Sequence, residues 1–319
     1  LTLRPLMTYL FQLESLLFGP WAPGYHIFNL TAHIICAWFL MKVTRRMGMH
    51  PIAATLTGLL FGLHPLNTQP LWILGDRAEV CVLLGGLVAL YYYGTNKIIP
   101  SAALLLALYS KETAITIPAW LLFYDLLFLD RIVSFKRTIR FRFQRILPPT
   151  LITLIYLIHR FAAFQGIGGY RSVDHARFSN ILDVLTQNLA WILTVDHYQW
   201  LMFFIAGILL VLIVLPWTPR ISRFGIIWFF IFLLPIHNLC NKWYLYVPAA
   251  ALITVFSGLL EPVIRNRSLR PITVFFILIA AFYLSMVSTA ELNHQYRNGK
   301  IPVAFSKELK KLQPVIKSG

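Results

Sequence analysis

The chain has 319 residues, of which 58% are hydrophobic and 13% charged, and its mean hydropathy is +0.69. Soluble domains carry roughly a quarter of charged residues, so this composition excludes an ordinary soluble protein and predicts an all-α, polytopic membrane protein. The net charge of +16 does not indicate nucleic-acid binding. The basic residues cluster at the ends of apolar runs, where lipid headgroups and the positive-inside rule place them.

The first 23 residues are predicted to form an interfacial segment. Leucines, Met7 and Phe11 recur on a rough helical stripe, and the triplet Phe18-Gly19-Pro20 ends it. The chain opens on Leu1 without the charged and apolar pattern of a signal peptide. We therefore expect that the sequence lacks its true N-terminus or was processed.

About ten apolar spans follow along the chain, and the shortest of them are interpreted as broken or tilted helices that line a cavity. Several are shorter than the roughly 20 residues that a straight spanning helix needs. The spans cover residues 25–44, 51–64, 78–95, 99–110, 113–129, 147–163, 199–216, 224–239, 243–260 and 272–289. The weakest are 51–64 and 99–110. We predict a membrane domain over residues 1–289, with a long outer loop at 164–198, and a basic tail at 290–319.

The distribution of charge predicts the orientation. Fifteen of the 28 basic residues lie in five loops that alternate with the polar breaks between spans. By the positive-inside rule these loops are cytoplasmic. They are residues 42–50, 96–98, 130–146, 217–223 and 261–271. The polar breaks and the C-terminal tail are then predicted to face the periplasm or a lumen.

Four polar breaks carry most of the chemically useful side chains. A charge near hydrocarbon costs several kcal/mol unless it is paired or faces water, so their position on one side predicts a polar site at the membrane surface. The breaks are His64-Pro65-Leu66-Asn67-Thr68-Gln69, Gly75-Asp76-Arg77-Ala78-Glu79, Ser110-Lys111-Glu112-Thr113 and His237-Asn238-Leu239-Cys240-Asn241-Lys242.

Lys111 has two interpretations that its position alone does not separate. An ammonium group at the interface can bind the phosphate of a lipid-linked substrate. It can equally reach lipid headgroups while Glu112 pairs with it. Arg77 is a candidate second phosphate ligand, but its neighbours Asp76 and Glu79 favour a local salt-bridge cluster at the start of a helix.

The remaining candidates have mainly structural interpretations. His64 is more typical of a hydrogen-bonded structural residue than of a base, and Asp196 and His197 are adjacent, so their side chains do not face each other on a helix. The Gly166, Gly168 and Gly169 group has no strand–helix context and is interpreted as a turn. The cysteines have no metal-ligand spacing, and neither a metal nor a cofactor is expected.

The order of these motifs resembles the membrane domain of TMTC-type protein O-mannosyltransferases, which carry tetratricopeptide repeats. The resemblance covers most of residues 4–130 and a short stretch near 244. Its most specific part is the pair formed by the HP…T and SKETA motifs. The matching runs are Arg4-Pro5-Leu6, Gly24 to Leu30 with His33, His64 to Gln69, Gly75 to Glu79, Ser110 to Ala114 with Pro118 and Tyr124-Asp125, and Tyr244 to Pro248.

The resemblance implies a GT-C-fold glycosyltransferase that takes sugar from a polyprenyl-phosphate donor on the outer side of the membrane. It implies that Lys111 and Arg77 bind the donor phosphate and that His64 shapes the pocket. The expected partners are this donor, a protein or glycan acceptor, and membrane lipids. The other expected pocket-lining residues are Gln69, Asp76, Glu79, Glu112, Lys242 and Tyr244.

The sequence departs from the family pattern at several positions, and these departures leave an alternative open. The family's catalytic acid belongs to a first outer loop, which we expect upstream of Leu1; Glu14 is the nearest acid but sits elsewhere and is not assigned. Gln69 replaces a glutamate, Lys242-Trp243 replaces Glu-Arg, and the usual repeats are missing. The alternative is a non-catalytic GT-C-like subunit of a membrane complex. A transporter is not favoured, because neither mid-span ionisable residues nor inverted repeats are clear.

Overall fold

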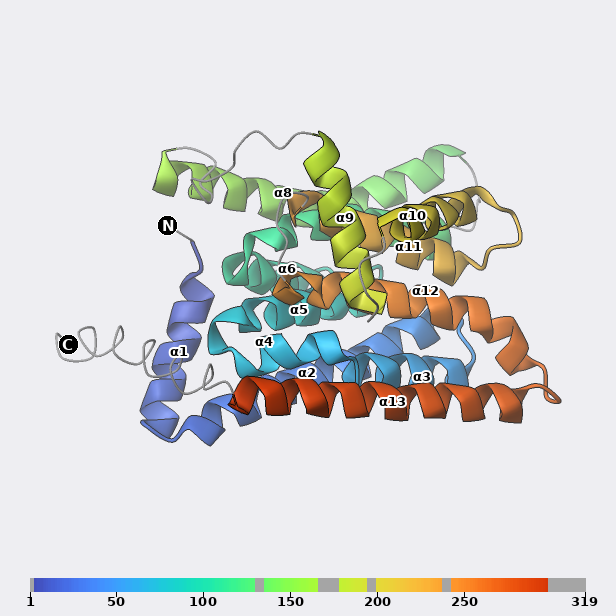
Figure 1. Ribbon diagram of the computed structural model, residues 1–319. Helices are drawn as coiled ribbons and strands as arrows, with labels where there is room; N and C mark the ends of the chain where they lie inside the picture. The colour runs from blue at the N-terminus through green and yellow to red at the C-terminus, as the bar shows by residue number, and fades with distance from the viewer. Residues whose placement is uncertain (1–2, 130–134, 166–177, 194–198, 237–241, 298–319) are drawn as a thin grey trace.

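The computed structural model describes residues 3–129, 135–165, 178–193, 199–236 and 242–297. Every regular element within these ranges is helical (Figure 1). The α-helices are α1 Pro5–Phe18, α2 Ala22–Arg46, α3 Pro51–Gly62, α4 Thr68–Trp72, α5 Ala78–Tyr92, α6 Ile98–Ser110, α7 Ile117–Tyr124, α8 Phe135–Phe164, α9 Phe178–Leu193, α10 Gln199–Val214, α11 Arg220–Leu233, α12 Tyr246–Arg265 and α13 Arg270–Arg297. The all-α prediction is confirmed.

Short non-α helices lie in or beside the polar breaks of the sequence, and one more, η4, lies at the end of α7. They are η1 Pro65–Asn67, η2 Leu74–Arg77, η3 Glu112–Thr116, η4 Asp125–Leu129, η5 Leu234–Ile236 and η6 Lys242–Leu245. Five of the six are 3-10 turns, and η4 is a π-helical turn that continues α7. Non-α backbone near a membrane is tolerated where it is buried in protein or lines a cavity.

Five described helical segments are long and apolar enough to cross a membrane, so the chain is a multi-pass integral membrane protein. They are Ala22–Arg46, Glu112–Leu129, Ile139–Phe164, Lys242–Arg265 and Arg270–Asn293. The other five predicted spans correspond to α3, α5, α6, α10 and α11, which have 12 to 16 residues. A straight crossing takes about 20 residues, so the number of ten stays a prediction.

Close helix packing builds the core. The α11–α12 and α5–α6 pairs make the most extensive contacts among the described elements. A Cβ on Gly225 would lie 2.9 Å from the Ala251 carbonyl oxygen, and one on Gly85 would lie 2.7 Å from that of Ala103. Small residues at such crossings allow the two backbones to approach. Trp120 then stacks on Trp228 in the core, with 4.4 Å between ring centroids.

Two parts of the chain differ from the predicted loop pattern. The predicted basic loop 130–146 is helical from Phe135, and it joins the predicted span 147–163 in the single helix α8, which accommodates Pro148 and Pro149. The predicted outer loop 164–198 contains the helix α9, which covers the amphipathic stretch from Ile181 to Leu193. The sequence pattern underestimated α8 because its first turns are rich in arginine, which suits a helix as well as a loop.

The helices connect two chemically different ends. At one end, which we call the basic face, Arg265 donates to the Gly48 carbonyl at 2.9 Å and Arg46 donates to the Tyr93 carbonyl at 2.9 Å. Figure 1 shows the α2–α3, α10–α11 and α12–α13 connections together at this end, and α1 across the opposite end. The helix α2 has 25 residues and joins the two ends over about 37 Å.

Candidate functional site

Three ion pairs join two of the four polar breaks, 75–79 and 110–113, to each other and to the N-terminal segment, at the end that α1 crosses. The Lys111 Nζ lies 2.7 Å from Glu79 Oε1, and the Arg4 Nη2 lies 2.9 Å from Glu112 Oε1. Arg77 pairs with Glu14 through Nη1 and Oε1. We call these six residues together with Asp76 the charged cluster. It joins groups up to 108 residues apart in the sequence.

Lys111 is placed by the end of α6. The helix stops at Ser110, and Lys111 adopts an extended backbone with its amide bonded to the Ala107 carbonyl at 3.1 Å. Its side chain is buried, with the Nζ 2.7 Å from Glu79 and 3.9 Å from the centre of the Tyr244 ring. A cation suits a helix C-terminus and an acid suits a first turn, so α6 and α5 each favour their member of this pair.

Arg77 is also buried, with 1% of its surface exposed. Its Nε donates to the Leu74 carbonyl at 3.2 Å, and its guanidinium lies 4.4 Å from the Phe11 ring centre and 5.7 Å from that of Phe28. The remaining terminal nitrogen, Nη2, has no hydrogen-bond partner among the described residues. Arg77 is therefore held by Glu14 and two aromatic rings.

The structural pairings differ from those expected from sequence proximity. Lys111 pairs with Glu79 and not with its neighbour Glu112, which binds Arg4 instead. Arg77 pairs with Glu14 and not with Asp76 or Glu79. Adjacent side chains on a turn or helix point in different directions, so partners from other segments reach each charge first.

Glu14 is the residue that the sequence interpretation set aside, and it is buried with 2% exposure. The residue spacing in α1 already indicated that the Glu14 side chain is buried. Met7, Phe11 and Glu14 are spaced four and three residues apart, so they share one helical face. That face packs inward, because Met7 and Glu14 are the buried residues of α1 and Phe11 contacts Arg77. A lone acid on an apolar face predicts a buried cationic partner.

Asp76 is half-buried and lies near the charges of Lys111, Glu79 and Arg4. Burial raises the pKa of this carboxyl to about 6, and the nearby Lys111 charge and a hydrogen bond with Gln69 oppose the rise only in part. The expected pocket residues Gln69 and Asp76 are thus brought together. Burial likewise raises the pKa of Glu14, against the opposing effect of Arg77.

His64 belongs to a different part of the structure. Its Nδ1 accepts the Leu66 amide at 3.3 Å and caps η1, and its Nε2 lies 3.0 Å from the Ile192 carbonyl. It lines a separate cavity of about 180 Å³, together with side chains of α9 and α12 that include Ile192 and Leu252. The structural interpretation of this histidine is favoured by these contacts.

Of the other predicted site residues, the structure describes Tyr244 and Lys242, whereas the rest lie outside the described ranges. Tyr244 is buried against Lys111, and Lys242 is half-buried at the start of η6. The glycine group at 166–169, the pair Asp196-His197 and the break from 237 to 241 lie outside the described residues. Within the described ranges, no group of three or more His, Cys, Asp or Glu side chains has a geometry for a metal ion.

The charge balance of the cluster limits its chemistry. Three cations face four acids, and the two most buried cations, Arg77 and Lys111, each have an acidic partner. A buried pair is costly to break because the remaining charge is left uncompensated. An anionic ligand at either cation therefore competes with a carboxylate that is already bound there.

Two known proteins are similar in sequence to about a third of this chain. The chain is 31% identical over 121 residues to Protein O-mannosyl-transferase Tmtc1 and 31% identical over 132 residues to Protein O-mannosyl-transferase Tmtc2, both from Drosophila melanogaster. Each match covers 35% of this chain and 14% of the relative's length. No protein-family model matches the chain. No solved structure matches it.

Proposed function

We propose that the chain is a membrane glycosyltransferase with a GT-C-like bundle, which takes a sugar from a polyprenyl-phosphate donor on the non-cytoplasmic face. The similarity to two proteins named as O-mannosyl-transferases supports a sugar-transfer activity. The observation that carries the proposal is the gathering of Arg77 and Lys111 at one end of the bundle. Lys111 binds Glu79, which follows Arg77 by two residues, and this contact supports the placement of both cations at the same end of the bundle.

In this proposal, the acceptor hydroxyl oxygen bonds to the anomeric carbon of the sugar while the bond from that carbon to the phosphate oxygen breaks. A carboxylate accepts the hydroxyl proton, and the lipid phosphate leaves with the bonding electrons. Lys111 and Arg77 stabilise the charge that grows on the phosphate. Such donors are often worth about 3 kcal/mol each in the transition state.

The pairing geometry adds a step to this proposal. The donor phosphate replaces Glu79 on Lys111 and Glu14 on Arg77, and the displaced carboxylates become available to accept a proton. Of the two, Glu14 lies on the N-terminal helix α1, whose contacts with the bundle are fewer than those of α5. We propose that α1 moves to admit the donor.

Lys111→Ala tests the proposal in proteoliposomes supplied with polyprenyl-phosphate mannose and an acceptor hydroxyl. Sugar transfer is expected to be lost while membrane insertion is retained. The matched control is Lys97→Ala, which removes an exposed lysine at the basic face. A rate of sugar transfer by Lys111→Ala equal to that of the wild type would exclude Lys111 as a ligand of the donor phosphate.

A second function is favoured by the same ion pairs. A chain whose buried cations are already neutralised can serve as a non-catalytic GT-C-like subunit, with the charged cluster holding α1 on the bundle. This alternative predicts that the wild-type chain neither binds the donor nor transfers sugar, and that it co-purifies with partner subunits. Donor-dependent transfer by the purified wild-type chain alone would reject it.

A further inference from the structure

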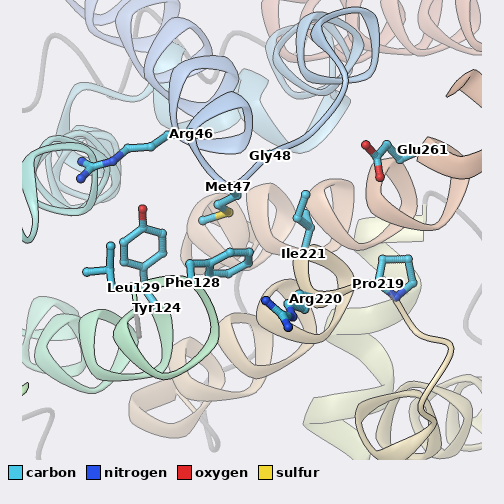
Figure 2. Close-up of a pocket in the computed structure, with 10 residues that line it drawn as sticks. All are labelled: Arg46, Met47, Gly48, Tyr124, Phe128, Leu129, Pro219, Arg220, Ile221 and Glu261. Carbon is cyan, nitrogen blue, oxygen red and sulfur yellow. The ribbon is translucent and has the colours of Figure 1, made fainter. Parts of the chain in front are cut away.

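A cavity of about 470 Å³ lies at the basic face, at the opposite end of the bundle from the charged cluster. Figure 2 shows that its walls come from the end of α2, the η4 turn, the start of α11 and the end of α12. Small-molecule sites typically occupy about 300–1,000 Å³. The volume is therefore sufficient for a polar headgroup.

Two arginine residues line this cavity. Arg46 uses its Nη2 to bind the Tyr93 carbonyl at 2.9 Å, and Arg220 is exposed at the start of α11. The acidic residue in the lining, Glu261, is compensated by Arg265 at 2.6 Å and by the His50 amide at 3.1 Å. The local charge of the cavity is consequently positive.

Basic segments of the chain add to the positive charge of this face. The five segments that the sequence predicts as basic loops contain fifteen lysines and arginines but only two acids, Asp130 and Glu261. Within the described part, Asp125 beside the cavity is also neutralised, because Arg145 lies 2.9 Å and Arg142 3.7 Å from its carboxylate. A patch of one sign concentrates anions near the surface.

Four apolar side chains form another part of the lining. Met47, Phe128, Leu129 and Ile221 form this wall. The cavity lies where the spanning helices α2 and α12 end, and Trp217 nearby is 75% exposed. Exposed tryptophans at the ends of spanning helices are typical of the headgroup region. The site thus offers cations for a phosphate and apolar side chains for the first part of an acyl chain.

We propose that this cavity is a binding site for the phosphate headgroup of an anionic membrane phospholipid. Basic pockets between spanning helices are known to bind such headgroups. The site is separate from the charged cluster and does not depend on the proposed sugar transfer. Its function is to hold a lipid between α2, η4 and α11.

The test measures lipid retention by the purified full chain with native mass spectrometry. Phosphatidylglycerol is expected to be retained in preference to phosphatidylcholine. Arg220→Gln is the main variant, because Arg220 is exposed and its replacement leaves the Arg46–Tyr93 contact intact. Loss of a charge-assisted hydrogen bond to a phosphate lowers the affinity about tenfold, so phosphatidylglycerol retention should fall by about that factor.

Arg267→Gln is the matched control, since Arg267 is exposed on the same face but does not line the cavity. It should leave retention within about twofold of wild type, less than the effect expected for a headgroup contact. An equal loss in both variants would overturn the proposal in favour of diffuse attraction. Equal retention of the two lipids would overturn it as well. Competition by glycerol 3-phosphate as effective as that by the lipid would assign the cavity to a soluble phosphate compound instead.

Discussion

At the residue scale, ion pairing explains how this apolar chain tolerates buried charged side chains. Lys111, Arg77 and their partners Glu79 and Glu14 are almost fully buried, and each cation meets a carboxylate from another segment. Aromatic rings cover the remaining faces of both cations. Removal of one member of a buried pair typically costs about 3–5 kcal/mol, so these pairs hold the N-terminal segment and three helix ends together.

Glu14→Ala should lower the free energy of unfolding by about 3 kcal/mol, because Arg77 is left buried without its counter-charge. Thermal unfolding in detergent measures this loss. Gln12→Ala on the exposed face of α1 is the control and should change stability by less than about 0.5 kcal/mol. Equal stability of the two variants would show that the Arg77–Glu14 contact does not stabilise the fold.

Donor binding should depend on pH through Asp76. Burial raises the pKa of this carboxyl to about 6, so it is neutral below that value and gains a negative charge as the pH rises through it. The added charge repels the donor phosphate, and the affinity should fall several-fold across this window. A titration of donor binding measures the effect, and Asp76→Asn should remove it. A variant with an unchanged pH profile would exclude Asp76 as its source.

At the element scale, the positions of the polar breaks were sufficient to predict where the apolar helices end. The Phe18-Gly19-Pro20 stop predicted a helix end in the same way: α1 ends at Phe18, and Gly19 adopts a positive φ of 51°, which glycine tolerates. Periodicity could not predict which charges would pair, because Glu79 and Glu14 reach their cations through tertiary contacts. Nor could it show that the apolar stretch near residue 120 has a 3-10 start and a π-helical end.

Gly225→Ala should destabilise the α11–α12 contact by about 1–3 kcal/mol, the usual cost of overpacking. The new methyl group would lie 2.8 Å from Val255 Cγ2 and 2.9 Å from the Ala251 carbonyl oxygen. Gly207→Ala is the control, because nothing lies within 4 Å of its added Cβ, and alanine favours a helix by up to about 1 kcal/mol. Unfolding midpoints that move in the same direction in both variants would contradict this account of the packing.

At the scale of the whole molecule, the helices separate a paired, nearly neutral charged cluster from a strongly basic face. Composition and charge were sufficient to predict an all-helical membrane protein. Of the four polar breaks, the structure joins those at 75–79 and 110–113 through the Lys111–Glu79 ion pair. The number of membrane crossings could not be predicted from the sequence, because five of the apolar helices are shorter than a straight spanning helix. They are α3, α5, α6, α10 and α11. Their burial against longer helices depends on tertiary packing.

The two ends should face opposite sides of the membrane, with the basic face in the cytoplasm. Single cysteines at exposed positions test this in a background without Cys36, Cys81 and Cys240. A membrane-impermeant maleimide should label Thr8→Cys from the non-cytoplasmic side and Arg267→Cys only after permeabilisation. Labelling of both positions from one side would contradict the predicted orientation.

The most direct test of the central claim is the binding of labelled polyprenyl-phosphate mannose to the reconstituted chain. Wild type and Lys97→Ala should bind the donor equally, whereas Lys111→Ala should bind at least about tenfold more weakly, because a charge-assisted contact to phosphate is lost. Equal donor binding by all three proteins, with all three correctly inserted, would contradict the assignment of the charged cluster as the donor site.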